Sequence, residues 1–216
     1  MKHYIILISL ASMTVLNGCK DQGKEGSNSA PDSLEVIVGE VEIEDKASDL
    51  YFSESIISFL DKNNAECSAH IKEGTKAYKH ETSSATGESK AMAEAGLAAL
   101  EDLDKKVEKG EIKDVSELEN TFLKAERAVV HTIIVKEEEI VVPMDSVSTS
   151  ASMFSNTLVH LKNLVNKEKG EAKKSGEKIV SKGDIIEAKI KNKEKVTIEE
   201  LKDFYTSAKN WLTTSL

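Results

Sequence analysis

Apolar residues recur at alternating steps of three and four along much of this 216-residue chain, which is the spacing of one face of an α-helix. The first run predicts a helix over about residues 48–78. Its seam consists of Leu50, Ser53, Ile57, Leu60, Asn64, Cys67, Ile71, Gly74 and Tyr78, and Phe52, Ile56 and Phe59 widen the apolar face. A polar loop is predicted over residues 79–87.

Two further helices are predicted in the middle of the chain. An alanine-rich helix covers about residues 88–109, with Gly110 as its stop. The next begins at a capping box, Ser116 with Glu119, and runs to about residue 142, where Pro143 ends it. Its segment 129–135 is rich in β-branched residues, so a strand is the alternative there. Helical spacing on both sides of the segment favours helix.

The last third of the chain predicts two more helices. One begins near Asp145, and its end beyond Val165 is left open because the sequence turns polar. The other opens at a second capping box, Thr197 with Glu200. Their apolar faces are Val147, Ala151, Phe154, Leu158, Leu161 and Val165 in the first, and Ile198, Leu201, Tyr205, Ala208 and Leu212 with neighbouring Trp211 in the second. The predicted fold is all-α, an antiparallel bundle of about five helices in one domain over residues 48–216.

The N-terminal segment has a different pattern. Lys2 and His3 precede an apolar stretch over residues 4–15, the layout of a secretory signal peptide over residues 1–18. The four residues Leu16-Asn17-Gly18-Cys19 resemble the bacterial lipobox, in which the cysteine thiol takes a diacylglycerol and its freed amine is acylated. An ordinary signal peptide and an N-terminal membrane helix are the alternatives. The polar run over residues 20–29 argues against both.

Two segments lie between the predicted lipidation site and the helices. Residues 19–33 form a lipidated, flexible tether, of which residues 20–33 would span about 20 Å as a coil. Residues 34–47 partly alternate apolar and acidic side chains. One strand without a partner is not stable, so we expect extended chain packed against the helices.

Charge and cysteine content narrow the classes of protein to which the chain can belong. The chain has 38 acidic and 29 basic residues, and loss of Lys2 with the signal peptide gives a net charge of −10, which disfavours general nucleic-acid binding. Residues 34–61 carry a net charge of −7 and residues 162–195 a net charge of +5. This segregation predicts a solvated surface or a pole that recruits a soluble partner. With Cys19 lipidated, Cys67 is the remaining thiol, and its place on an apolar seam favours a buried structural role over a reactive one.

The sequence offers no catalytic constellation. His70, His80, His131 and His160 are far apart along the chain, and no HExxH, CxxC, GxSxG or phosphate-binding glycine motif occurs. We therefore predict no catalytic residues, no metal site and no cofactor, and a protein that is not an enzyme.

The lipobox from Leu16 to Cys19, the Gly/Ser/Asn tether, the preference for Lys over Arg (28 Lys against Arg127 alone) and the helical body resemble spirochaete surface lipoproteins. The signal segment over residues 1–8 and the helical region are most similar to the factor H-binding lipoproteins of relapsing-fever Borrelia. The resemblance implies a lipid anchor in the outer membrane with the protein facing outward. It implies capture of the complement regulator factor H, which blunts opsonisation, and for some members binding of plasminogen.

That family has no short binding motif that can be carried over residue by residue, so ligand-binding residues stay unassigned. Exposure and polarity suggest loops and helix ends distal to the lipid, including residues 79–87 or the lysine-rich segment 166–195. One alternative function is an adhesin for a host proteoglycan or glycosaminoglycan. Another is a structural protein with its lipid facing the periplasm.

Overall fold

The described part of the chain, residues 47–141 and 151–214 of a computed structural model, consists of α-helices joined by short turns. The elements are α1 (Ala47–Leu60), α2 (Asn64–Glu81), α3 (Gly87–Glu108), α4 (Val115–Val141), α5 (Ala151–Lys167), α6 (Gly170–Lys191) and α7 (Ile198–Thr214). The all-α prediction is confirmed for these residues. Residues 1–46, with Pro143, Asp145 and Val147, lie outside them.

Seven helices replace the expected count of about five in the described residues, because one predicted helix is broken by a turn and α6 follows the helix whose end the sequence left open. The break follows Leu60. Lys62 adopts a positive φ of 60°, and the Asn63 side chain accepts a hydrogen bond of 3.2 Å from the Glu66 amide, which caps α2. Asparagine suits this position because its short side chain can replace a missing helical partner of the backbone.

A second turn separates α5 from α6. Gly170 has a φ of +59°, a left-handed conformation that glycine adopts at little cost. Lys169 before it is extended, with φ −128° and ψ 161°. This helix, α6, covers the polar region beyond Val165. In that region the sequence did not predict where the preceding helix ends.

Of the two predicted capping boxes, one is confirmed and one is wrong. The Glu200 amide donates to Thr197 Oγ1 at 3.2 Å, and the Thr197 amide donates to Glu200 Oε2 at 2.9 Å. At α4, however, the Ser116 amide donates to Asp114 Oδ1 at 2.8 Å. Asp114 therefore caps α4, and Ser116 lies inside the helix.

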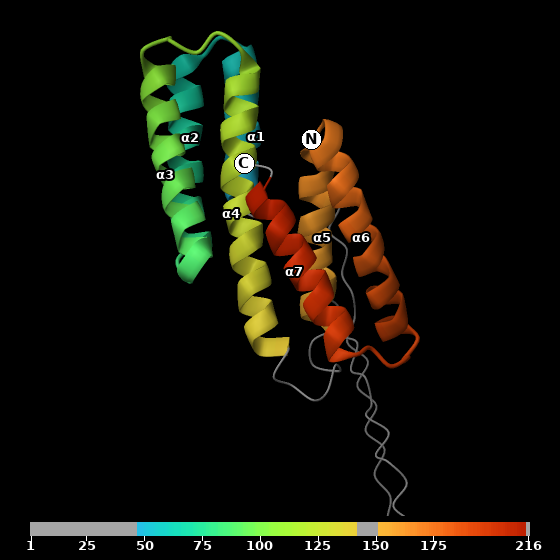
Figure 1. Ribbon diagram of the computed structural model, residues 1–216. Coiled ribbons are helices and arrows are strands. Elements are labelled where there is room, and N and C mark those ends of the chain that lie inside the picture. The colour runs from blue at the N-terminus through green and yellow to red at the C-terminus, as the bar shows by residue number, and fades with distance from the viewer. Residues whose placement is uncertain (1–46, 142–150, 215–216) are drawn as a thin grey trace, which may run out of the picture. The chain divides into compact units, whose positions relative to one another are not determined.

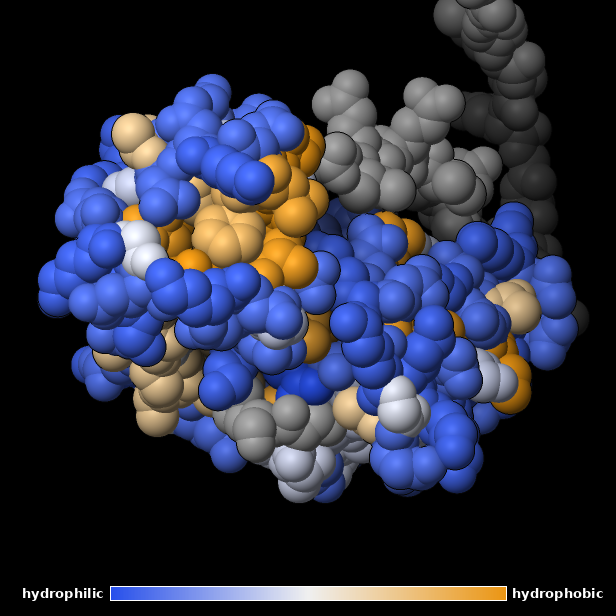
Figure 2. All heavy atoms as spheres, turned by 90° about the horizontal axis from the view of Figure 1, so that it is seen from above, coloured by the Kyte–Doolittle hydropathy of each residue, from blue (hydrophilic) through white to orange (hydrophobic). Residues whose placement is uncertain are grey.

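The first predicted seam is correct in α2 and wrong in α1. Cys67, Ile71, Gly74 and Tyr78 are all buried on α2. In α1, Leu50, Ile57 and Leu60 are 57%, 60% and 61% exposed. Seen from above, from the end where α1 passes into α2, hydrophobic atoms gather into a patch within a largely hydrophilic surface (Figure 2). Because the helix is interrupted after Leu60, α1 is rotated about its own axis independently of α2. The seam that is continuous in the sequence therefore lies on an exposed face in α1 and on a buried face in α2.

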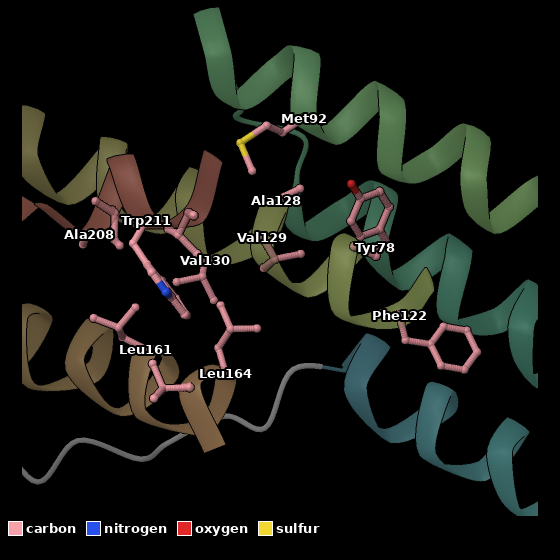
Figure 3. Close-up of a cluster of buried hydrophobic side chains, with 14 of the residues drawn as sticks. Tyr78, Met92, Phe122, Ala128, Val129, Val130, Leu161, Leu164, Ala208 and Trp211 are labelled. Carbon is pink, nitrogen blue, oxygen red and sulfur yellow. The ribbon is translucent and has the colours of Figure 1, made fainter. Parts of the chain in front are cut away.

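Helix α4 lies between two groups of helices (Figure 1). It packs against α1, α2 and α3 on one side and against α5 and α7 on the other. In the core, Val130 lies near Leu161 and Trp211, whereas Val129 lies toward Tyr78 (Figure 3). The segment 129–135, for which a strand was the alternative, is helical inside α4. All described helices belong to one compact unit, residues 35–216.

Helix α6 approaches its neighbours through two glycines. Gly176, Ile179, Gly183 and Ile186 are its buried residues, and their spacing of three, four and three makes a helical seam. A Cβ on Gly176 would lie 2.5 Å from Val165 Cγ2 and 2.8 Å from Trp211 Cζ2. Glycine is thus required there by close packing.

We predict that Gly176→Ala lowers the free energy of unfolding. Overpacking a core costs about 1–3 kcal/mol, which exceeds the gain of up to about 1 kcal/mol in helix propensity. Urea denaturation followed by circular dichroism measures the difference. Ser175→Ala, at the exposed neighbouring position, is the control and should change stability by less than about 0.5 kcal/mol. Equal or greater stability of Gly176→Ala would contradict the packing.

Candidate ligand-binding surface

The residue with the most readable chemistry in the sequence, Cys19, lies outside the described residues. Its lipidation therefore stays a prediction. Among the helices of residues 47–141 and 151–214, none combines the length and the hydrophobicity that crossing a membrane requires.

The histidines do not assemble into a site. His70 Nδ1 lies 3.1 Å from Glu54 Oε2, and His131 Nδ1 lies 2.7 Å from Ser89 Oγ. His80 is exposed on the last turn of α2, and His160 is on α5. No group of three His, Cys, Asp or Glu side chains in the described ranges is placed to hold a metal ion.

Cys67 is fully buried, as its place on the seam predicts. Burial raises the pKa of its thiol to about 11, and the nearby Asp104 carboxylate adds to the rise. Because the thiolate is the reactive form of cysteine, this thiol is unreactive at neutral pH. The structure assigns Cys67 to the core.

A buried carboxyl group connects three helices. Glu137 on α4 accepts a hydrogen bond of 2.6 Å from the Tyr205 hydroxyl on α7 and another from the Thr157 hydroxyl on α5. Burial raises the pKa of Glu137, and the two hydrogen bonds partly oppose that rise. No feature of the sequence singles out this glutamate among 38 acidic residues. Its partners are all core side chains, so its role is structural.

The one arginine of the chain, Arg127, also lies in the interior. Its Nε donates to Glu168 Oε1 at 2.8 Å, and its Nη2 donates to the same oxygen. The guanidinium carbon lies 5.5 Å from the ring centroid of Trp211, within the range of a cation–π interaction. Arg127 therefore ties α4 to the α5–α6 turn and to α7. Its planar fork and its stacking explain why lysine would not serve at this position.

A groove of about 410 Å³ lies beside this ion pair, between α1, α4 and the α5–α6 turn. Its apolar wall combines Phe52 and Ile56 of α1 with Phe122 and Leu123 of α4. The Phe52 and Phe122 rings stack with centroids 4.4 Å apart. The remaining lining residues are polar or charged: Ser53, Glu119, Asn120, Glu126, Lys167, Glu168 and Lys169.

The charges around this groove are largely paired. Lys167 Nζ donates to Glu126 Oε1 at 2.7 Å, and Lys169 Nζ lies 3.7 Å from Glu119 Oε2. Glu168 is the partner of Arg127. The groove therefore offers an apolar wall with a nearly neutral rim, which suits an apolar side chain of a partner better than a charged small molecule.

The first candidate binding segment, residues 79–87, lies where α1 begins. Residues 79–81 are the end of α2, and residues 82–86 form the turn into α3. Glu81 accepts hydrogen bonds from the Ser48 amide at 3.1 Å and the Ser48 hydroxyl at 2.6 Å. The turn after α1 and the turn after α3 form the opposite end of these helices (Figure 1). A ligand surface far from the start of α1 would thus include residues 61–63 and 109–114.

The second candidate segment, residues 166–195, is mostly helix α6 and the turns on either side of it. Seven of the eleven lysines between residues 162 and 195 lie within 4 Å of a carboxylate: Lys162, Lys167, Lys169, Lys174, Lys182, Lys189 and Lys191. The positive charge predicted from the sequence is therefore largely matched by acidic groups of this chain. Four further lysines of this segment, Lys173, Lys178, Lys193 and Lys195, are the ones left for a partner.

Comparison of the chain with protein-family models, with curated proteins and with solved structures gives no match.

We predict that Glu137→Gln changes how stability depends on pH. Because the pKa of Glu137 is raised in the folded state, its favourable contribution is complete at acidic pH and is lost as pH rises through that folded pKa. Glutamine keeps the uncharged form at every pH. The free energy of unfolding of the wild type, relative to the variant, should therefore fall between pH 4 and pH 8 in urea denaturation.

Comparison with the variant also removes the effect of His131. Burial lowers the pKa of His131, so its contribution is lost in the opposite direction, as pH falls. His131 is present in both proteins and cancels in the difference. If the difference in the free energy of unfolding between wild type and variant stays constant between pH 4 and pH 8, Glu137 titrates alike in the folded and unfolded chains.

Proposed function

We propose that this protein is a lipid-anchored surface lipoprotein of the outer membrane, whose antiparallel helical bundle captures the host complement regulator factor H. Plasminogen is a second proposed ligand. In this proposal the protein carries out no reaction of its own. It serves complement evasion by holding a host regulator at the cell surface.

The observation that carries this proposal is the Leu16-to-Cys19 lipobox, followed by a polar tether and a helical body. Several acyl chains anchor stably, because each buried methylene contributes about 0.8 kcal/mol. The prominent polar networks of the described helices, at Arg127 and Glu137, hold helices of this chain together. The choice of factor H as the ligand rests on the resemblance to the Borrelia lipoproteins.

Two surfaces are proposed to contact the ligand. One is the α2–α3 turn, residues 82–86, which lies at the end where α1 begins rather than at the opposite end, and which can be exchanged without disturbing the Glu81 contact with Ser48. The other is the set of four lysines on and after α6 that take no part in the ion pairs of that segment. Long-range attraction by such exposed charges sets the on-rate and the orientation of a complex.

The alternative of an adhesin for glycosaminoglycans has less support, because most lysines of the basic segment are paired with carboxylates. A polyanion would have to displace those partners. Adhesion of this kind would be blocked by added heparin and would fall steeply with salt, since binding a polyanion releases counterions.

The direct test is a pull-down from human serum with the full chain carrying Cys19→Ala. Factor H should be recovered in solution, because the anchor is not part of the ligand surface. The same variant expressed in cells should lose recruitment of factor H to the surface. Absence of factor H from the pull-down, or surface recruitment that survives Cys19→Ala, would contradict the proposal.

Charge variants then locate the contact. Replacing Lys173, Lys178, Lys193 and Lys195 together by Gln should reduce factor H recovery by about tenfold at low salt, as loss of steering charges does. The matched control replaces four exposed lysines elsewhere by Gln: Lys105, Lys109, Lys124 and Lys136. A third variant carries a Gly/Ser linker in place of residues 82–86. Undiminished binding by the first and third variants would rule out both surfaces.

A further inference from the structure

Helix α1 carries large apolar side chains on its outward face as well as on its inner face, where Phe52, Ile56 and Phe59 contact the core. Its buried residues are Ser48, Phe52, Ser55 and Ser58. Its outward face carries Leu50, Ile57 and Leu60, which are all more than half exposed. We call these three residues the α1 stripe. Surface helices of globular proteins place their apolar stripe toward the core, so this face indicates a contact with another apolar surface.

The orientation of α1 is fixed by its inner face. Phe52 is 2% exposed and stacks on Phe122 of α4. A Cβ on Gly74 of α2 would lie 2.6 Å from Phe52 Cε1, so this ring fills the space that the glycine leaves open. The Ser55 hydroxyl donates to the Phe52 carbonyl at 2.7 Å. Turning the α1 stripe inward would expose Phe52 and empty this site, so the stripe stays outside.

We propose that the α1 stripe is a self-association surface and that its occupant is the α1 stripe of a second copy of this chain. Leu50 and Ile57 are one heptad apart, and Leu60 follows three residues later. This is the a/d spacing of helices that pack side by side. The same pattern on two copies is self-complementary, as a two-fold symmetric contact requires.

The charges next to the stripe are compatible with a like partner. Glu54 lies 3.1 Å from His70 Nδ1, and Asp49 lies 3.9 Å from Lys167 Nζ. Both acidic side chains of α1 therefore have a basic partner in their own chain. These pairs reduce the like-charge repulsion between two copies on α1 itself, whereas the net charge of −7 over residues 34–61 adds a repulsion that salt screens.

The groove beside the stripe adds depth to this contact. Ser53, which lies between Leu50 and Ile57 on the helix, lines the groove together with Ile56. Side chains of the second copy can thus reach the apolar wall formed with Phe122 and Leu123. The apolar area available to the contact is therefore larger than that of the three stripe residues alone.

The expected association is weak in solution. A helix of 14 residues is about 21 Å long, so the contact is smaller than the standard interface of about 800 Å² for each partner. On a membrane, tethered copies meet at a high effective concentration, which strengthens a weak contact. This last step rests on the lipid anchor of the proposed function, whereas the contact itself does not.

Sedimentation velocity tests the contact on the full chain with Cys19→Ala, which removes the lipid from the measurement. The weight-average sedimentation coefficient should rise toward that of a dimer as the concentration increases to the millimolar range. The double variant Ile57→Ser/Leu60→Ser should lose this rise. Ile185→Ser is the matched control, because Ile185 on α6 is 58% exposed and lies outside the stripe. It should associate like the parent chain.

Cross-linking gives a second readout at the same surface. Ser53→Cys places a thiol within the stripe and should form a disulfide-linked dimer under mild oxidation, whereas Lys178→Cys on α6 should not. Circular dichroism checks that each variant is helical, so a lost contact is not mistaken for a lost fold.

Three results would overturn the proposal: a monomer at every concentration, association that survives Ile57→Ser/Leu60→Ser, or association that appears only after deletion of residues 34–46. The last would mean that the preceding segment of the chain covers the stripe. None of these results depends on factor H or on lipidation, so failure of this proposal is distinguishable from failure of the proposed function.

Discussion

The burial of the middle of α4 on every side is the constraint on which the rest of the structure depends. Residues 125–132, more than two helical turns, are all buried. A helix buried all round needs partners in every direction, and here α1, α2 and α3 supply one side and α5 and α7 the other. Some of its buried polar atoms have partners in place: Arg127 Nε and Nη2 donate to Glu168, and His131 Nδ1 lies 2.7 Å from Ser89 Oγ. Neither group of helices would have a complete core without α4.

The sequence predicted most of this architecture where apolar spacing was regular. The seams of α2, α5 and α7 and the Thr197 capping box follow from residue types at short range, so one sequence suffices to find them. The break after Leu60 was missed because the apolar spacing of the sequence continues in register across the turn, from Leu60 to Asn64. Helix α6 was not predicted as a separate helix, because its buried face alternates glycine with isoleucine and glycine contributes no apolar signal.

The candidate sites were harder to predict, for a physical reason. Whether a lysine is available to a ligand depends on carboxylates from other helices, as with Lys182 and Asp203 or Lys189 and Glu200. Whether an apolar residue is buried depends on how its helix is rotated about its axis. In α1 the packing of Phe52 determines this rotation. Both are long-range properties of the fold. The two surfaces proposed to contact a ligand, the α2–α3 turn and the four unpaired lysines on and after α6, could therefore not be assigned from residue types alone.

Native-state hydrogen exchange at increasing denaturant measures directly whether α4 makes the two helix groups one cooperative unit. If α4 is shared, the most protected amides of α2, α3, α5 and α7 should exchange through a single global opening with a common free energy and denaturant dependence. Peptides from α5 and α7 that exchange through a separate opening of lower free energy, while those of α2 and α3 stay protected, would contradict the account.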